Sequence, residues 1–456
     1  WQPVGAFWLE PDCNLISGES FVRHILHGLR FWMQEFGFQS QVCWLPDVFG
    51  ISWALPQILV RSGIKVLLSN KFFVWNDTNP WRQNTFYWEG ADGSRVLTVI
   101  PPGHFIGMVD PDHMQQYWQD YTEKETLGEC IYTYGWGDGG GGVDPEMLEC
   151  AIRYNDFPGV VPTRFSQPEN ALLRIATLVD EDALELPIWS DELYLEAHRG
   201  TYTTKGRLKK LNRASEVLLR QIEMLATLAW AHGNHPYPTE PIDTAWKALL
   251  ETQFHDALPG THITEVYHYL LGRYADLLRL ADAVRDAAGN ALFGDNFGDH
   301  VLIMNPYHTP LYGVITVPAE VLMYRQLADK QGRARPFQRV RNMDGTDDVL
   351  IQISPQNAIP PLGYRIFPTT DSEQAVAADA ELQVRMDDER HGIIENRYLR
   401  ARLNPRGELV SLYDKEAQRE ILQGVGGNVF KLYEDRPGKY DAWDIIAAYL
   451  EQELPI

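Results

Sequence analysis

The chain has 456 residues, more than one ordinary domain holds, so we expect roughly two to four domains with substantial hydrophobic cores. Hydrophobic residues make up 45% and charged residues 22%, which is typical of a soluble globular protein, and no low-complexity block indicates disorder. The formal net charge of −22 disfavours nucleic acid and anionic membrane surfaces as partners, and it favours neutral substrates or cations.

The cysteine pattern and the short apolar runs indicate the cellular compartment. The four cysteines are Cys13, Cys43, Cys130 and Cys150. They are widely spaced and form no CxxC pair, which favours reduced thiols in the cytoplasm over a disulfide framework. No apolar run approaches the roughly 20 residues that a membrane-spanning helix needs, and no signal-peptide pattern is present. We therefore expect a cytoplasmic protein without a membrane partner.

The first part of the chain alternates apolar runs with amphipathic helical patterns. Ser17 is predicted to be the N-cap of a helix that reaches about residue 36, and Gly63 is predicted to end the next helix. This alternation is typical of parallel strands joined by crossover helices, so residues 1–180 are expected to form an α/β barrel or a related wound sheet. The predicted strands are residues 5–9, 41–45, 64–69 and 130–133, and the predicted helices are residues 18–36 and 52–61.

The rest of the chain changes character twice. Apolar residues at helical spacing, with short connections rich in proline, predict a three-helix bundle within residues 181–295. Residues 296–456 are β-rich, with Pro, Gly and Asp clusters between apolar runs, and predict the start of a β-sandwich domain. The predicted helices are residues 203–232, 242–252 and 264–288, and the clearest strands are residues 301–304, 312–317 and 349–353.

The two ends of the sequence also carry an expectation. The chain begins without Met, and its last strands cannot all find partners before residue 456. We therefore expect both ends to be cuts in a longer chain.

Two short segments place carboxylates and an imidazole at points suited to catalysis. Asp47 follows a predicted strand directly, and parallel barrels present catalytic groups there, although a plain turn residue is the alternative. His255 and Asp256 adjoin at the end of a predicted helix, before Pro259 and Gly260. An imidazole beside a carboxylate suits a metal or proton-transfer site, and a capped helix end explains the pair about as well.

Two further segments suggest a polyol ligand. The glycine-dense loop over residues 134–144 lets the backbone approach a ligand closely, but it lacks the Lys-Ser/Thr of a P-loop. Asp138 in the middle of this loop would repel phosphate, so a neutral polyol is the more suitable ligand. Residues 196–204 combine polar and aromatic groups that can bind hydroxyls. The alternative is that Thr203 or Thr204 only serves as the N-cap of the next helix.

Taken in this order and at these distances, the segments resemble glycoside hydrolase family 38, the class II α-mannosidases, and in particular its cytosolic and bacterial branch. The resemblance covers about residues 4–300 and extends only loosely into the β-rich remainder. It rests on residues 8–14, 17–20, 44–50, 75–76, 86–90, 92–97, 137–142, 198–203 and 255–263.

The resemblance implies a zinc site and a nucleophile. It implies that Asp47 both ligates zinc and attacks the anomeric carbon, and that His255 is a second zinc ligand. The family's other two ligands form a His-x-Asp pair on the first barrel strand, which we expect upstream of residue 1. In such an enzyme, one zinc binds the 2- and 3-hydroxyls of mannose, orients the ring and assists its distortion toward an oxocarbenium-like transition state.

A retaining mechanism also needs a carboxylic acid roughly 5 Å from the nucleophile. The resemblance points to Asp138, although this sequence reads Gly-Asp-Gly-Gly where better-known relatives carry consecutive aspartates. Asp144 and Asp256 are the alternatives.

By the same resemblance, seven residues are predicted sugar contacts: Trp8, Glu10, Asp12, Trp75, His198, Arg199 and Tyr202. The alternative for Trp8 and Trp75 is aromatic packing, and for Arg199 it is a surface ion pair of little energetic weight.

The predicted function is therefore that of a retaining, zinc-assisted α-mannosidase that hydrolyses terminal α-linked mannose from oligosaccharides, with the fragment itself inactive. Mannose-containing oligosaccharides are the predicted partners, together with a possible homo-oligomer, without nucleic acid or membrane. Two alternatives remain open: a catalytically incomplete fragment that binds glycans, and a zinc-dependent hydrolase of acyl or amide groups in which Asp47 is a general base.

Overall fold

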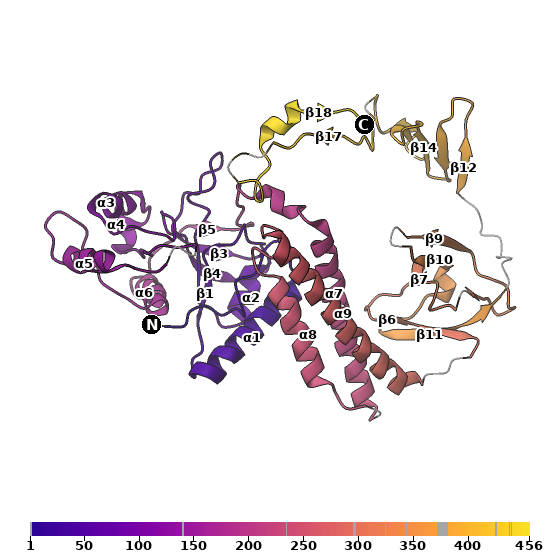
Figure 1. The fold of residues 1–456 in the computed structure, drawn as a ribbon, viewed down its shortest axis with the longest axis horizontal. Coiled ribbons are helices and arrows are strands. Elements are labelled where there is room, and N and C mark those ends of the chain that lie inside the picture. Colours follow the sequence, from indigo (N-terminus) through magenta and orange to yellow (C-terminus); the bar gives the residue numbers. More distant parts are fainter. Residues whose placement is uncertain are drawn as a thin grey trace. The chain divides into compact units, whose positions relative to one another are not determined.

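A computed structural model of the protein describes residues 2–138, 141–233, 235–294, 298–323, 325–342, 345–371, 382–424, 426–436, 438 and 440–456. The chain divides into two compact units, each described by itself (Figure 1). Unit 1 consists of Trp1–Ala288 and Arg436–Ile446, and unit 2 consists of Gly289–Asp435 and Ala447–Ile456. All predicted site residues lie in unit 1. The predicted division at residues 180 and 295 stays a prediction.

Unit 1 contains a five-stranded sheet with the order β1-β2-β4-β3-β5. Its strands are β1 (Val42–Leu45), β2 (Val66–Ser69), β3 (Thr85–Glu89), β4 (Arg95–Val99) and β5 (Ile188–Trp189). Three of the pairs are parallel, but β3 and β4 are antiparallel, so the expected parallel sheet is corrected to a mixed one. The reason is the connection over residues 90–94, where Gly90 N donates to Ser94 O in a turn far too short for a crossover helix.

The helices around this sheet begin and end close to the predicted signals. Ser17 is the N-cap of α1 and its side chain accepts a hydrogen bond from Ser20 N, while Gly37 ends the helix with φ 63°. The predicted helix over residues 52–61 begins only at Leu55. The helices are α1 (Gly18–Phe36), α2 (Leu55–Arg61), α3 (Pro111–Asp120), α4 (Lys124–Leu127), α5 (Pro145–Tyr154) and α6 (Pro168–Glu181).

Both faces of the sheet are covered. Cys43, Leu67 and Trp88 point to one face and pack in a core that also contains buried residues of α1 and α2. Val66 and Leu97 point to the other face and pack against α6. Successive residues of a strand face opposite sides, so apolar runs without alternation supply both cores. The described strands form an open sheet, and a closed barrel is not confirmed.

The strand predicted at residues 5–9 is wrong. Ala6 and Phe7 are buried, but their backbone lies on α1, where a Cβ added to Gly28 would come within 2.2 Å of Ala6 O. Trp8 N donates to His24 O rather than to a strand. The apolar run is therefore buried by contact with a helix, and the one backbone bond from Trp8 N to that helix takes the place of a strand partner.

The strand predicted at residues 130–133 is also wrong. This segment is held by side chains instead of by a neighbouring strand. Tyr117 Oη donates to Ile131 O at 2.5 Å, and Tyr132 Oη donates to Met108 O at 2.6 Å. Next to it, Gly135 N donates to Gly107 O at 3.0 Å, so the segment and the loop after β4 lie side by side.

The three long helices predicted for the middle of the chain are present. They are α7 (Gly206–Ala231), α8 (Thr239–Thr252) and α9 (Thr264–Phe293), preceded by the short 3₁₀ helix η1 (Arg199–Tyr202). They lie side by side in Figure 1 and share one hydrophobic cluster, to which Leu219, Trp246 and Tyr274 contribute from the three helices in turn. Their arrangement as a bundle remains the interpretation, and α8 also contacts α1.

Unit 2 is built of antiparallel strands, and the three predicted runs correspond to β6, β7 and β10, although the second run begins one residue before β7. Its sheets have the orders β7-β10-β9, β6-β11-β8, β12-β13-β14-β15-β16 and β17-β18. A sandwich arrangement is not confirmed. The strands are β6 (His300–Asn305), β7 (Gly313–Pro318), β8 (Gln326–Leu327), β9 (Phe337–Arg341), β10 (Asp347–Ile353), β11 (Gly363–Thr370), β12 (Gln383–Met386), β13 (Gly392–Glu395), β14 (Leu399–Leu403), β15 (Leu409–Asp414), β16 (Arg419–Glu420), β17 (Leu432–Tyr433) and β18 (Glu453–Leu454), with 3₁₀ helices η2 (Pro355–Asn357) and η3 (Ala447–Glu451).

Throughout the part of the chain that the structure describes, no helix combines the length and apolarity needed to cross a bilayer.

Candidate active site

Asp47 lies in the loop between β1 and α2, two residues beyond the strand. Leu45, Val48 and Phe49 on either side of it are buried in the core, which holds the loop against the end of the sheet. The Asp47 backbone N donates to Glu10 Oε1 at 2.6 Å. The Asp47 side chain is 25% exposed, so the carboxylate faces an opening rather than the core.

Lys71 forms an ion pair with Asp47. Its Nζ lies 2.5 Å from Asp47 Oδ1, and the ammonium also lies over the Phe49 ring, 4.5 Å from the ring centroid. Burial alone raises the pKa of Asp47, but the hydrogen bond from His255 and the charge of Lys71 outweigh it, and the net pKa is lowered. Asp47 is thus an ionised carboxylate at neutral pH, as a nucleophile or a metal ligand must be.

His255 is the second close neighbour of Asp47. Its Nε2 lies 3.4 Å from Asp47 Oδ2 and 3.5 Å from Asp256 Oδ2. On the other side of the ring, Nδ1 lies 3.2 Å from Glu10 O, and the His255 backbone N donates to the same oxygen at 3.1 Å. The two residues that the family resemblance pairs are therefore adjacent, although one follows a strand and the other follows α8.

The hydrogen bonds of His255 determine what can lie next to Nε2. A backbone carbonyl only accepts, so Nδ1 carries a proton for Glu10 O. Nε2 then faces the carboxylates of Asp47 and Asp256, an arrangement that requires either a second proton or a shared cation. Burial lowers the pKa of His255, but Asp47, Glu10 and Asp256 together raise it above its ordinary value.

Glu10 and Asp12 are both placed near this pair, with different roles. Burial raises the pKa of Glu10 to about 7, against the opposing charge of His255. Asp12 is 2% exposed, and its Oδ1 accepts hydrogen bonds from Asn14 N at 3.0 Å and Leu15 N at 2.6 Å. Asp12 therefore stabilises the turn that follows Glu10, which is a structural use of a predicted sugar contact.

A group of aromatic rings lies beside the Asp47–Lys71 pair. The His198 ring is 4.6 Å from Phe49 and 6.2 Å from Trp75, and Trp75 is 6.3 Å from His104. Among the described residues, the buried atoms His198 Nδ1 and Trp75 Nε1 have no hydrogen-bond partner. Burial, Lys71 and Asp47 together leave the pKa of His198 at about 3, so its ring is neutral. These two predicted sugar contacts therefore lie beside the loop that carries Asp47, and their role as sugar contacts stays a prediction.

The other predicted contacts lie farther out. Trp8 packs against Phe31 of α1 and lines a cavity of about 390 Å³ with Lys247 and Arg273. Arg199 is half exposed, and its guanidinium lies 3.4 Å from Glu196. This is the surface ion pair given above as the alternative to a sugar contact.

Tyr202 lines a separate groove with Asn14 and Trp53. Its Oη lies 3.5 Å from Asn14 Nδ2, which also donates to Phe49 O at 2.8 Å. Asn14 therefore connects this groove to the loop that carries Asp47.

The three candidate acids differ in their surroundings. Asp144 is the N-cap of α5 and accepts from Met147 N, so it serves the helix. Asp256 accepts from Thr261 Oγ1. Asp138 is exposed with φ 50°, while the next two residues of its loop lie outside the described residues. Burial and the charge of Lys71 lower the pKa of His104, whereas the charges of Asp47 and Asp138 act in the opposite direction.

A segment from the C-terminal part of the chain completes the aromatic wall within unit 1. Gly200 N donates to Trp443 O at 2.9 Å, and His198 N donates to Asp444 Oδ1 at 2.6 Å. The Tyr440 ring lies 5.7 Å from Trp75. These residues and Lys71 are absent from the sequence-based predictions. The Tyr-Asp-Ala-Trp-Asp run at residues 440–444 was the available signal, but it lies in a region assigned to another domain.

The donors at Asp47 and His255 fit two ligands of a zinc site. A carboxylate and an imidazole are ordinary zinc ligands, and the contact of Nδ1 with Glu10 O is the kind of outer interaction that orients a ligating histidine. Zinc sites built from protein ligands alone use four, so further donors are required.

A second cluster of possible metal donors lies in unit 2. Asp387, Glu389 and His391 are the one group in the described part of the chain with three donors within 4.8 Å of one another. The Arg402 guanidinium lies 2.9 Å from Asp387 and 2.7 Å from Glu389, so both carboxylates already have a cationic partner within the protein. We assign no metal to this cluster.

Comparison with known proteins places these observations in a family. Residues 1–192 match the glycosyl hydrolases family 38 N-terminal domain, residues 196–292 the alpha mannosidase middle domain, and residues 394–456 the family 38 C-terminal domain. The chain is 33% identical over 458 residues to alpha-mannosidase 2C1 of Homo sapiens, covering 100% of this chain and 41% of that protein. It is 39% identical over 285 residues to alpha-mannosidase of Saccharomyces cerevisiae, covering 58% and 25% respectively.

A solved structure shares the fold. The crystal structure of an alpha-mannosidase from Enterococcus faecalis V583 superposes with a TM-score of 0.67 at 19% identity, covering 91% of this chain and 52% of that chain. The chain thus spans 41% of the length of the human relative that it matches.

Proposed function

The chain belongs to glycoside hydrolase family 38, and from this premise we propose that it is part of a retaining α-mannosidase that removes terminal α-linked mannose from oligosaccharides. The observation that carries the proposal is the contact of the Asp47 carboxylate with His255 Nε2 at 3.4 Å and with Lys71 Nζ at 2.5 Å. An ionised carboxylate at the end of a strand, beside an oriented imidazole, has the chemistry that a glycosidase nucleophile needs.

In the proposed mechanism Asp47 attacks the anomeric carbon while the bond from that carbon to the leaving oxygen breaks. A carboxylic acid protonates the leaving oxygen, and Asp138 is our candidate because Asp144 caps α5 and Asp256 bonds to Thr261. Water then attacks the same carbon, gives its proton to the acid/base carboxylate and releases Asp47.

Zinc, when bound, would supply a Lewis acid for the 2- and 3-hydroxyls of mannose, and Asp47 and His255 would hold it. Lys71 keeps Asp47 ionised and fixes one carboxylate oxygen, which leaves Oδ2 directed to His255. His198 and Trp75, which carry buried polar atoms without partners among the described residues, are proposed hydroxyl contacts beside Asp47.

We further propose the finer architecture and setting that this family membership suggests. Residues 1–180 correspond to the α/β barrel-like catalytic domain, residues 181–295 to a three-helix bundle and residues 296–456 to the start of a β-sandwich domain. The protein is proposed to be cytoplasmic and to act on mannose-containing oligosaccharides, without a nucleic-acid or membrane partner, as its net charge of −22 favours.

Covalent labelling of the full-length enzyme tests the mechanism. A slow fluorinated mannosyl substrate should accumulate as a glycosyl-enzyme ester on the peptide around Asp47, and mass spectrometry should locate the added sugar there. Asp47→Asn should abolish the label. An enzyme that hydrolyses mannosides with Asp47 unlabelled would remove the nucleophile assignment, and an enzyme active only on acyl or amide substrates would replace the function.

A further inference from the structure

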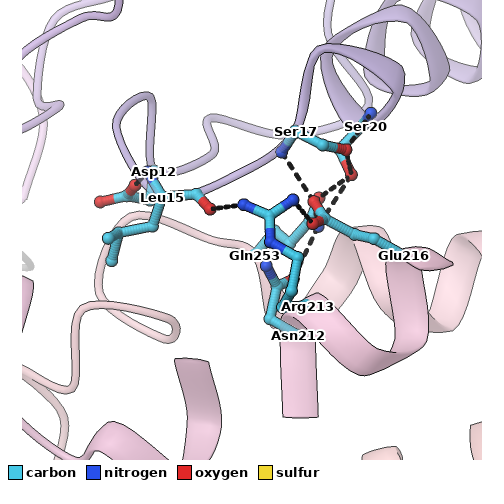
Figure 2. A network of polar contacts seen from close by, with 8 residues as sticks. All are labelled: Asp12, Leu15, Ser17, Ser20, Asn212, Arg213, Glu216 and Gln253. Atoms are coloured by element: carbon cyan, nitrogen blue, oxygen red, sulfur yellow. Dashed lines mark hydrogen bonds and ion pairs between the residues drawn. The ribbon is translucent and has the colours of Figure 1, made fainter. Parts of the chain in front are cut away.

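A buried polar network joins α1 to α7 at the end of α8, as Figure 2 shows. Glu216 of α7 accepts hydrogen bonds from Ser17 N and from Ser20 Oγ, both at 2.7 Å. Gln253, which directly follows α8, donates from Nε2 to Glu216 Oε1 at 3.2 Å and to Ser20 Oγ at 3.0 Å. Ser20, Glu216 and Gln253 are each 5% exposed or less, so water does not replace these contacts.

The orientation of the Gln253 amide is determined by its neighbours. Nε2 also lies 2.8 Å from Asn212 Oδ1, so its two hydrogens are shared among three acceptors, while Oε1 lies 3.1 Å from His24 Nε2. An amide oxygen only accepts, so His24 donates from Nε2. The amide therefore presents its NH₂ group to Glu216 and its oxygen to α1.

The backbone around Gln253 is tied directly to the active site. Gln253 O accepts from Asp12 N at 2.8 Å, and His255 N donates to Glu10 O at 3.1 Å. Glu10 in turn accepts from Asp47 N through Oε1 at 2.6 Å. The polar network thus holds the segment of residues 253–255, which carries His255. The backbone of this segment in turn holds residues 10–12, which carry Glu10.

Burial of a carboxylate here contributes little to stability by itself. The cationic partner of Glu216 is Arg213, whose Nη1 lies 2.6 Å from Oε2 but whose side chain is 58% exposed, so solvent weakens the pair. Replacement of buried ionic groups by apolar ones is often neutral or stabilising, whereas such groups can impose one particular arrangement. The network lies where α1, α7 and the His255 segment meet. This position indicates that the network fixes how these three segments are arranged, rather than adding to stability.

We propose that Glu216 and Gln253 are positioning residues of the active site, which set His255 and Glu10 at their distances from Asp47. The kinetic consequence of this inference rests on the proposed function. Neither side chain contacts a reacting atom, and both act through the backbone pairing of Glu10 and Asp12 with Gln253 and His255.

A charge exchange within the pair tests the proposal in the full-length protein. Q253E brings a second carboxyl group to about 3.2 Å from Glu216, where the two either repel each other or share a proton, and in both cases the NH₂ group that donates to Ser20 and Asn212 is lost. We expect kcat on an aryl α-mannoside to fall about 10- to 100-fold with a smaller change in KM, the range seen for groups that orient a functional side chain. In Q253E/E216Q one carboxylate again faces one amide, and we expect most of the lost kcat to return.

Glu169 provides a matched control for E216Q. It is 3% exposed and accepts from Ser40 Oγ at 3.0 Å and from Gln41 N at 2.8 Å, the same two kinds of donor that Glu216 binds. It lies on α6, on the opposite face of the sheet from α1. E169Q and E216Q should lower the melting temperature to a similar extent, but only E216Q should lower kcat.

Hydrogen exchange at the Asp12 and His255 backbone N–H groups gives a readout that does not need activity. Both should exchange faster in Q253E and E216Q than in E169Q, and the double variant should restore their protection. Equal kcat per folded molecule in all four variants, or a double variant no better than Q253E, would overturn the proposal. If Q253E does not fold, the comparison of kcat between E216Q and E169Q tests the proposal. A wild type without mannosidase activity would refute the proposed function, while hydrogen exchange would still decide the positioning role.

Discussion

At the scale of single residues, the site depends on charges held close together in partly buried surroundings. Asp47 has a close neighbour on each carboxylate oxygen, the Lys71 ammonium at 2.5 Å and His255 Nε2 at 3.4 Å. Glu10 is next to both the Asp47 backbone and the His255 ring, and burial raises its pKa to about 7. Burial raises the pKa of an isolated carboxyl, so the protonation state of Asp47 follows from these neighbours.

Replacement of Lys71 tests this dependence. K71Q removes a cation that lowers the pKa of Asp47, so this pKa should rise and the acidic limb of the pH–rate profile should move to higher pH. We expect kcat/KM at neutral pH to fall roughly 10- to 100-fold. The measurement is kcat/KM against pH in the full-length enzyme. K65Q, at an exposed position just before β2, is the control, and an acidic limb unchanged in K71Q would contradict the assignment.

His24 should make the stability of the protein depend on pH. It is fully buried, and burial lowers its pKa from 6.5 to about 3. Between these values the unfolded chain binds a proton that the folded chain does not, so stability rises with pH in this window and is lost as pH falls from 6.5 toward 3. The contribution is about 1.4 kcal/mol per pH unit.

The corresponding variant is H24Q, which retains a donor for the Gln253 amide. Its free energy of unfolding, measured in urea from pH 4 to pH 7, should depend less steeply on pH than that of the wild type. Equal slopes would show that His24 is protonated in the folded protein.

At the scale of elements, close contact between backbone segments places the site residues. Residues 6–7 lie directly on α1 at Gly28, and this contact leads the chain to Glu10. Gly200 similarly allows Trp443 O to approach, since a Cβ there would lie 3.1 Å from that oxygen. Glycine is required by proximity at position 28, because the contact is with backbone atoms that cannot rotate away, whereas at position 200 a Cβ would be tight and Trp443 would have to move by a few tenths of an ångström.

The pair G28A and G18A isolates this effect on one helix. A Cβ at position 28 would come within 2.2 Å of Ala6 O, whereas a Cβ at position 18 meets no atom within 4 Å. G28A should destabilise the protein by about 2–4 kcal/mol despite its better helix propensity. G18A should be neutral or slightly stabilising. Chemical denaturation measures both, and equal free energies of unfolding would mean that residues 6–7 do not pack on α1.

At the scale of the whole molecule, the chain carries matches to the N-terminal, middle and C-terminal parts of one enzyme family but spans 41% of the length of its human relative. Residues 436–446 belong to the same compact unit as the sheet and the long helices, although unit 2 separates them in sequence. The site therefore draws on residues from position 10 to position 444.

Metal content concerns the whole molecule, because the two proposed ligands, Asp47 and His255, are fewer than the four that a zinc site built from protein ligands alone uses. The 456-residue chain should retain less than one zinc after dialysis, whereas a version extended upstream should retain one per chain. Elemental analysis by mass spectrometry measures both. H255A in the extended version should lower the content. Tight, stoichiometric zinc in the 456-residue chain would mean that the ligand set is misassigned.

Much of this protein was predictable from local pattern. Ser17 and Gly37 mark the ends of α1, and periodic apolar residues mark α7, α8 and α9. The sequence segments around Asp47 and His255 carry the family resemblance. Such features depend on short stretches of chain, where capping, helical period and motif spacing are all visible. The Asp-Gly dipeptide before β4 is likewise a local signal, and it indicates the reversal of chain direction between β3 and β4.

The tertiary structure decided what local pattern does not contain. An apolar run at residues 5–9 is buried equally well by a strand partner or by a helix with a glycine, and only the packing on Gly28 distinguishes the two. The pairing of Lys71 with Asp47, and the return of Trp443 and Asp444 to His198, join positions remote in sequence. A side chain's protonation state and role depend on the charges and surfaces that folding brings next to it, and sequence order does not specify these neighbours.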